Sequence, residues 1–375
     1  MKQRFSILVI SLVLLSCISC QKDDDLTVNS KEELEQKLKD EVERKDLISI
    51  AYCVVKNDKI LHSGALGYAD EDKNILAQNT TRYLVASISK TITAVALMQL
   101  VEQNIISLDD DINTFLPYPV RNPNYPNEKI TYRMLLSHTS SISDDFLNTF
   151  DLDCFGRDCP MTLAQFFTNV FVSGGTFYSS KNFSKNRPGT KEDYSNVASA
   201  LVGYLVERIT KTPFDSYCKN KIFIPLDMTK TEWRLANIPL SELAIPYSSE
   251  ITSANPHYTF PDYPNGGLRT NVLDLSKFLR AIMLNGSLNG TQILTPSSVT
   301  QMKTLQFGST AQCLSFYYEL IGAKEYLGHS GGEKGATAEM YFDKDSTTGV
   351  IVFSNEEDAP LDNIMTLLFN YGKQQ

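Results

Sequence analysis

The segment from Ile88 to Val101 constrains the fold most, because a helix over these residues would be apolar on every face. Its apolar positions are Ile88, Ile92, Val95, Ala96, Leu97, Leu100 and Val101. A helix of this kind is buried in a protein interior. Ser87 and Lys90 stand at its start, where buried polar groups need a partner or a function. The chain is therefore expected to fold around a central helix that carries a serine and a lysine at one end.

Ser87 and Lys90 are spaced so that their side chains lie on one helix face, one turn apart. Burial and the positive end of the helix dipole both disfavour an ammonium, so we expect Lys90 to accept a proton near neutral pH. The free N–H groups of the first turn make the Ser87 amide a natural half of an oxyanion hole. The alternative is a serine N-cap beside a lysine that reaches solvent.

Two further motifs follow in order, Tyr194-Ser-Asn196 and Gly328-His-Ser-Gly-Gly332. The three motifs supply a hydroxyl nucleophile, an amine, a phenol and a glycine-rich strand edge, which an acyl-transfer enzyme needs. Each motif alone is weak evidence. Other copies of S-x-x-K and Y-x-N begin at Ser19, Ser216, Tyr125 and Tyr263. Context separates them, since only the Ser87 copy opens an apolar helix.

The ordered motifs resemble those of the serine β-lactamase and penicillin-binding-protein-like hydrolases, in the branch of class C β-lactamases, D,D-peptidases and esterases. The resemblance runs from about Ser49 to Asn355. It also includes Leu108-Asp-Asp-Asp-Ile112, the segment 130–140, Pro188-Gly-Thr190, Pro225-Leu-Asp-Met228 and Asn265-Gly-Gly-Leu268. It implies an α/β (α+β) fold, in which helices flank an antiparallel β-sheet, a large insertion is mostly helical, and the active site lies in the seam.

The resemblance also implies catalytic roles. Ser87 would be the nucleophile and Lys90 its partner. Tyr194 would relay the proton that activates water for deacylation. Asn196 would bind substrate and orient Lys90. We expect no metal or cofactor, because no histidine, cysteine or carboxylate spacing in this chain suggests a metal site.

His329, Ser330 and Gly331 would bind substrate where the family has Lys-Thr-Gly, and the backbone N–H of Gly332 would complete the oxyanion hole with that of Ser87. His329 departs from the lysine that β-lactamases mostly keep. A neutral or half-charged imidazole binds a substrate carboxylate less firmly than an ammonium does. Ser141 also stands where the family usually has glycine, which bears on a turn rather than on the chemistry.

The segment Gly328–Gly332 also matches G-x-S-x-G, the nucleophile elbow of α/β-hydrolases. That interpretation requires a helix after Ser330 and a later histidine. The histidines are His62, His138, His257 and His329, and none follows Ser330. Segments 336–342 and 349–353 are predicted to be hairpin strands, so the required context is missing.

The N-terminus predicts export. Lys2 and Arg4 precede an apolar run over 5–15, which is typical of a signal peptide and too short to span a bilayer. A cysteine that closes such a segment resembles a bacterial lipoprotein acceptor, and we expect lipidation at Cys20, with Cys17 or an ordinary secretory peptide as alternatives. The acidic residues after Cys20 favour an outer-membrane lipoprotein in the cell envelope, on its periplasmic or surface-exposed face.

The net charge and the cysteines limit which partners and which disulfide the sequence allows. Without Lys2 and Arg4 the chain has 33 basic and 44 acidic residues, a net charge of −11. This charge argues against nucleic acid as a partner and against a basic membrane-surface helix, so contact with the membrane is expected only through the lipid anchor. Cys154 and Cys159 could form a disulfide in an oxidising compartment, but spacing leaves the pairing open. Cys53 is expected to be buried. We expect a monomer.

The predicted organisation is a lipoprotein signal peptide over 1–19, an acidic tether over 20–30, and a single hydrolase domain over 31–375 with a mostly helical insertion at about 104–265. The expected elements are a helix over 31–45 behind a capping box at Ser30–Glu33, a hairpin over 48–55 and 59–68, a helix over 87–103, strands within 325–355 and a helix over 361–371.

The predicted function is hydrolysis of a small amide or ester through an acyl-enzyme, by a peptidase or amidase of D,D-peptidase type. The alternatives are a carboxylesterase of the same family and a non-catalytic, cell-wall-binding surface lipoprotein. The loops at about 118–127, 145–187 and 247–264 should line the pocket, but they contain no pattern that identifies the substrate.

Overall fold

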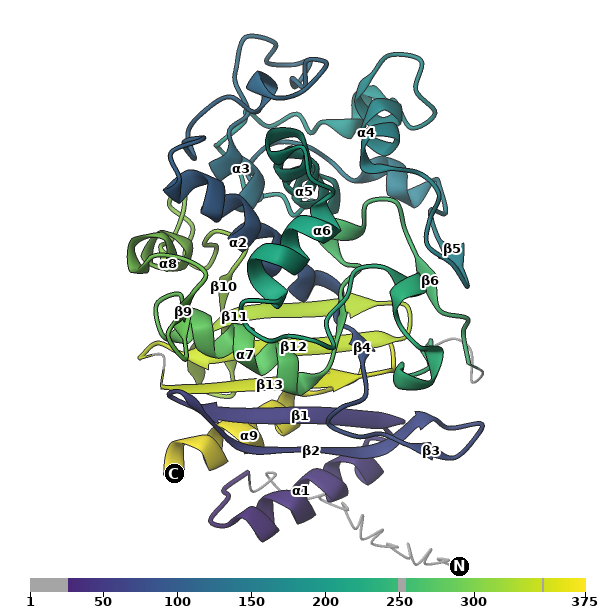
Figure 1. The fold of residues 1–375 in the computed structure, drawn as a ribbon, viewed down its shortest axis with the longest axis vertical. Helices are drawn as coiled ribbons and strands as arrows, with labels where there is room; N and C mark the ends of the chain where they lie inside the picture. The colour runs from purple at the N-terminus through teal and green to yellow at the C-terminus, as the bar shows by residue number, and fades with distance from the viewer. Residues whose placement is uncertain (1–25, 249–253, 346) are drawn as a thin grey trace, which may run out of the picture.

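A seven-stranded antiparallel sheet forms the base of the molecule, in the order β10-β11-β12-β13-β1-β2-β3 (Figure 1). The computed structural model describes residues 26–248, 254–345 and 347–375. The predicted signal peptide, Cys17 and Cys20 lie outside the described residues. The strands are β1 Ser49–Lys56, β2 Lys59–Asp70, β3 Ile75–Leu76, β10 Tyr317–Ile321, β11 Lys324–Glu333, β12 Ala336–Asp343 and β13 Thr348–Ser354.

Strand β1 lies between the N-terminal strand β2 and the C-terminal strand β13, and it pairs with both. Both of its faces are buried, which explains its nearly continuous apolar sequence. Ala51, Cys53 and Val55 pack into the core on one face, while the alternate residues, such as Ile50 and Val54, pack into the core on the other. The predicted hairpin and the burial of Cys53 are confirmed.

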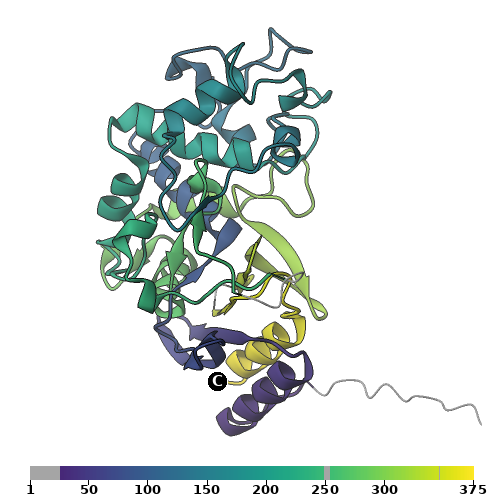
Figure 2. The same cartoon turned by 90° about the vertical axis from the view of Figure 1, so that its right-hand side faces the viewer.

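Helices cover both faces of the sheet. Helices α1 (Lys31–Arg44) and α9 (Asp362–Gln374) lie side by side on one face, as Figure 2 shows near the C-terminus. Helix α7 (Val272–Met283) packs on the other face against β1 and β13. Ser30 caps α1 by accepting from Glu33 N, but the Glu33 carboxylate accepts from Asn29 N–H rather than from Ser30 N–H, so the predicted capping box is not reciprocal.

Helix α2 (Ser89–Glu102) is buried along almost its whole length and passes between the sheet and the remaining helices. A 3₁₀ turn at Ala86–Ile88 precedes it. The remaining α-helices are α3 Tyr132–Leu136, α4 Leu163–Phe171, α5 Asn196–Thr210, α6 Phe214–Cys218 and α8 Pro296–Lys303. Helices on an antiparallel sheet, with a mostly helical region beside it, confirm the predicted fold class. None of the described helices is long and apolar enough to cross a bilayer.

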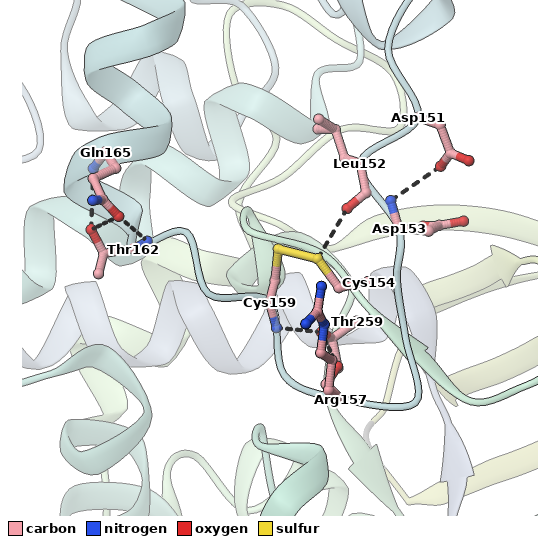
Figure 3. The surroundings of a disulfide bond; sticks show 9 residues. All are labelled: Asp151, Leu152, Asp153, Cys154, Arg157, Cys159, Thr162, Gln165 and Thr259. Carbon is pink, nitrogen blue, oxygen red and sulfur yellow. Dashed lines mark hydrogen bonds between the residues drawn. A yellow bond between two sulfur atoms is a disulfide. The ribbon is translucent and has the colours of Figure 1, made fainter.

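Short strand pairs connect the loops around the helical region: β4 Tyr83–Leu84 with β7 Arg269–Thr270, β5 Cys154–Phe155 with β6 Tyr258–Thr259, and β8 Ser287–Leu288 with β9 Thr291–Gln292. The structure joins Cys154 to Cys159 in a disulfide (Figure 3). Cys159 N also donates to Thr259 Oγ1 at 2.8 Å, so the disulfide loop is held against β6.

Candidate active site

Lys90 is the centre of a buried hydrogen-bond cluster at the start of α2. Its Nζ donates to Ser87 Oγ at 2.9 Å, to Asn196 Oδ1 at 2.8 Å and to the Asn265 carbonyl oxygen at 2.9 Å. The lysine is 1% exposed, so it does not reach solvent and the alternative of a snorkelling lysine is wrong. Three acceptors from three segments hold the amine in one position beside the Ser87 hydroxyl.

The turn that presents Ser87 is sharply bent. Ala86 has φ +44°, a conformation that non-glycine residues rarely adopt and that costs about 1 kcal/mol or more. Neighbouring bonds fix the turn, because Val85 N donates to Leu268 O at 3.0 Å and Leu268 N donates to Ser89 Oγ at 3.1 Å. The bend leaves the Ser87 side chain half-buried at the end of a buried helix.

Tyr194 lies over the same cluster, with its ring centroid 5.0 Å from Lys90 Nζ. It is 48% exposed and stacks on His138 at 4.3 Å between ring centroids. His138 Nδ1 accepts from Ser195 N–H at 3.2 Å, and burial holds the pKa of His138 well below its usual value. The neutral imidazole of His138 therefore packs against the phenol ring of Tyr194.

Asp144 positions the Tyr194–Asn196 turn. Its carboxylate accepts from Ser195 Oγ at 2.6 Å, from Asn196 N at 2.5 Å and from Val197 N at 3.2 Å. These N–H groups belong to the first turn of α5, where a carboxylate is favoured by the helix dipole. Burial nevertheless raises the pKa of Asp144. The carboxylate fixes Asn196, which in turn binds Lys90.

Strand β11 lies directly against the Ser87 turn. A Cβ added at Gly331 would lie 2.5 Å from Val85 O and 3.1 Å from Ser87 N, so only glycine allows this approach. β10 pairs with β11 as far as Gly328, which leaves residues 329–333 unpaired on that side. Ser330 N–H points to this edge, and backbone groups alternate along a strand, so the N–H of Gly332 points to the same edge. The predicted oxyanion-hole amide thus lies on an open edge beside Ser87.

His329 is 2% exposed and lies within 2.5 Å of the Ser330 carbonyl oxygen through Nδ1. A carbonyl only accepts, so Nδ1 carries the proton and donates. Burial, and then the charge of Lys90, lower the pKa of His329 to about 3. The sequence left the His329 imidazole either neutral or half-charged, and its lowered pKa makes it neutral. Ser330 is followed by the end of β11, a turn and strand β12 rather than by a helix, which excludes the nucleophile elbow.

A cavity of about 560 Å³ opens beside the lysine cluster. Its lining residues include Asn196, Asn265, Asp262, Glu333 and the loop 147–153. Asp262 is 4% exposed and accepts from Asn265 Nδ2 at 2.7 Å, and burial raises its pKa to about 7. Burial, followed by the charge of Asp153, also raises the pKa of Glu333. The cavity walls therefore carry several carboxyl groups together with Lys334, which forms an ion pair with Asp153.

The structure brings the sequence-predicted site residues together: Lys90 bonds Ser87 and Asn196, Tyr194 lies over Lys90, and β11 brings His329 to Gly332 alongside. Sequence reasoning missed His138, Asp144 and Asp262. His138 lies in the segment 130–140, which is part of the resemblance to the family. That resemblance is the one sequence signal that could have identified it.

A family model described as Beta-lactamase matches residues 34–368. Protein flp of Staphylococcus aureus (strain N315) is 26% identical over 260 residues, which are 68% of this chain and 49% of that protein. The chain thus spans about half the length of this relative.

Two solved structures are similar in fold. The D-amino acid amidase from Ochrobactrum anthropi SV3, complexed with L-phenylalanine, has a TM-score of 0.74 and 20% identity, over 91% of this chain and 98% of that one. The octameric penicillin-binding protein homologue from Pyrococcus abyssi has a TM-score of 0.70 and 20% identity, over 92% of this chain and 77% of that one.

Proposed function

The chain belongs to the beta-lactamase family of serine hydrolases, and on that premise we propose that it hydrolyses small amides through an acyl-enzyme on Ser87, as a peptidase or amidase of D,D-peptidase type. The observation that carries the proposal is the contact of buried Lys90 Nζ with Ser87 Oγ at 2.9 Å, beside a glycine strand that no side chain could approach as closely.

The reaction follows from the placement of these groups. Ser87 Oγ attacks the substrate carbonyl carbon, and its proton passes to whichever of Lys90 and Tyr194 has lost its own proton. The carbonyl oxygen becomes an anion that the N–H groups of Ser87 and Gly332 stabilise. The C–N bond then breaks, and the amine leaves with a proton from the same pair. Water, deprotonated by Tyr194, attacks the acyl-enzyme, releases the acid and returns the proton to Ser87.

Substrates built on D-amino acids are the first to test. The similar amidase from Ochrobactrum anthropi acts on D-amino acid amides by its name, and the cavity beside Lys90 has room for a small acyl group. A carboxylesterase is the second candidate, since the same acyl transfer serves an ester. The non-catalytic alternative is disfavoured, because the cluster around Lys90 is complete.

We also propose the cellular context predicted from the N-terminus, a lipoprotein of the bacterial outer membrane anchored at Cys20. Metabolic labelling with an alkyne fatty acid would test it, since Cys20→Ala should remove the label and Cys17→Ala should keep it. The monomeric state stays a prediction, because one of the similar solved structures is an octamer.

The experiment for the enzymatic proposal is a hydrolysis panel on the purified protein. It compares D-alaninamide, L-alaninamide, an acetyl-D-alanyl-D-alanine peptide, a phenyl ester and a chromogenic cephalosporin. Turnover of an amide in the panel, lost in Ser87→Ala, is the expected result. Turnover of the ester alone would replace the amidase with the carboxylesterase, and no turnover of any member would favour the non-catalytic alternative.

A further inference from the structure

Glu333 lies on the face of β11 that is turned toward the nucleophile. A Cβ added at Gly331 would lie 3.1 Å from Ser87 N, so Gly331 faces the Ser87 turn. Side chains alternate along a strand, so Glu333, two residues further on, points to the same side about 7 Å away. Glu333 directly follows Gly332 and lines the cavity of about 560 Å³. Its carboxyl group is therefore within reach of an acyl group bound to Ser87.

Asp262 lines the same cavity beside the lysine cluster. Its Oδ2 accepts from Asn265 Nδ2 at 2.7 Å, and the carbonyl oxygen of Asn265 accepts from Lys90 Nζ at 2.9 Å. Asp262 is 4% exposed, and no other residue among those that the structure describes binds its second carboxyl oxygen, Oδ1. Buried polar groups normally have partners, so a buried carboxyl oxygen beside a cavity points to a donor on a ligand.

The two lysines near these carboxyl groups are already engaged. Lys90 has three protons, and all three are directed to acceptors in the cluster around Ser87. Lys334 donates to Asp153 Oδ2 at 2.5 Å, outside the pair formed by Glu333 and Asp262. The cavity therefore offers two carboxyl groups whose charge no neighbouring lysine neutralises by direct contact.

Glu333 has only one weak contact with a donor. Tyr258 Oη is 3.5 Å from Glu333 Oε2, but its single proton is directed to the Lys334 carbonyl oxygen at 2.9 Å. Burial raises the pKa of both Glu333 and Asp262, and neighbouring carboxylates add to the effect. A cation placed between the two groups would relieve this repulsion, because an opposite charge favours the ionised form of a carboxyl group.

We propose that Glu333 and Asp262 are specificity-determining residues that bind the free α-ammonium group of the substrate's acyl part. With the carbonyl carbon at Ser87 Oγ, the α-amino group is only two bonds from that carbon and can enter the cavity. This inference rests on the proposed function and deepens it. The substrate class becomes amides of amino acids with an unblocked amino group, rather than peptides in which that group is acylated.

The test compares D-alaninamide with D-lactamide, in which a hydroxyl group replaces the ammonium on the same carbon with the same handedness. Ammonia release at pH 7, where the α-amino group is mostly protonated, gives kcat and KM for both. Wild-type enzyme should have a KM at least about tenfold lower for D-alaninamide, because charge-assisted hydrogen bonds to a carboxylate are the stronger ones. A KM for D-alaninamide that is equal or higher would overturn the inference while leaving the hydrolase intact. Hydrolysis of neither amide would overturn the proposed function itself.

Glu333→Gln removes the charge and keeps the shape of the side chain. The ratio of the KM for D-lactamide to that for D-alaninamide should fall by about tenfold, and Asp262→Asn should also lower it. Comparing ratios between enzymes cancels the intrinsic difference in reactivity between the two amides. Glu325→Gln, on the same strand but exposed and paired with Lys344, is the matched control and should keep the wild-type ratio. An unchanged ratio in folded, active Glu333→Gln, or in Asp262→Asn where Glu333→Gln does not fold, would also overturn the inference.

Discussion

Replacing Asp262 by asparagine should change how the stability of the protein depends on pH. Asp262 is 4% exposed, and burial raises its pKa from 3.8 to about 7. The folded protein therefore binds this proton more tightly than the unfolded chain does. The stability that the proton contributes is complete below about pH 4 and is lost as pH rises through about 7. Asparagine imitates the protonated acid, and its carbonyl oxygen can still accept from Asn265 Nδ2.

The size of the effect follows from the pKa difference of about three units. At 1.36 kcal/mol for each unit, wild-type protein should lose up to about 4 kcal/mol between pH 4 and pH 8 that Asp262→Asn keeps. Urea unfolding at a series of pH values, followed by fluorescence of the buried Trp233, measures the difference between the two proteins. Asp145→Asn, an exposed site nearby, is the control. Parallel curves for wild type and Asp262→Asn would show that the Asp262 proton does not contribute to stability.

Three further changes probe the site. Tyr194→Phe should lower kcat by about 10²–10⁴-fold and let acyl-enzyme accumulate in intact-protein mass spectra, whereas full activity would assign the protons to Lys90 alone. Asp144→Ala should cost about 2–4 kcal/mol in thermal or urea unfolding, since it leaves the α5 N–H groups without their acceptor, and an unchanged melting curve would contradict this. Gly331→Ala should slow acylation about 10²-fold by pushing β11 from Ser87. Gly332→Ala, where an added Cβ meets nothing within 4 Å, should lose less, and the opposite order would argue against the proposed contact.

The sequence was enough to predict the residues around Lys90, because their motifs occur in a fixed order and one of them opens a helix that is apolar all round. It also predicted the hairpin and the closing helix, whose apolar periodicity is strong. Helix α7 could also have been predicted, because Asn271 caps it and apolar residues recur along it at helical spacing. It was not among the predicted elements.

The supporting residues could not be predicted in the same way. Asp144 acts on Ser195 and Asn196 from about fifty positions away, through backbone N–H groups that any sequence would have. Neutrality of His329 depends on burial, which follows from the packing of β11 rather than from the motif.

The central claim is that Ser87 is the nucleophile, and the most direct measurement is the position of a covalent adduct. The protein is treated with a fluorophosphonate, digested and sequenced by mass spectrometry. We predict one adduct on Ser87, which is absent from Ser87→Ala and retained in Ser330→Ala. An adduct on Ser330, or undiminished labelling of Ser87→Ala, would contradict it.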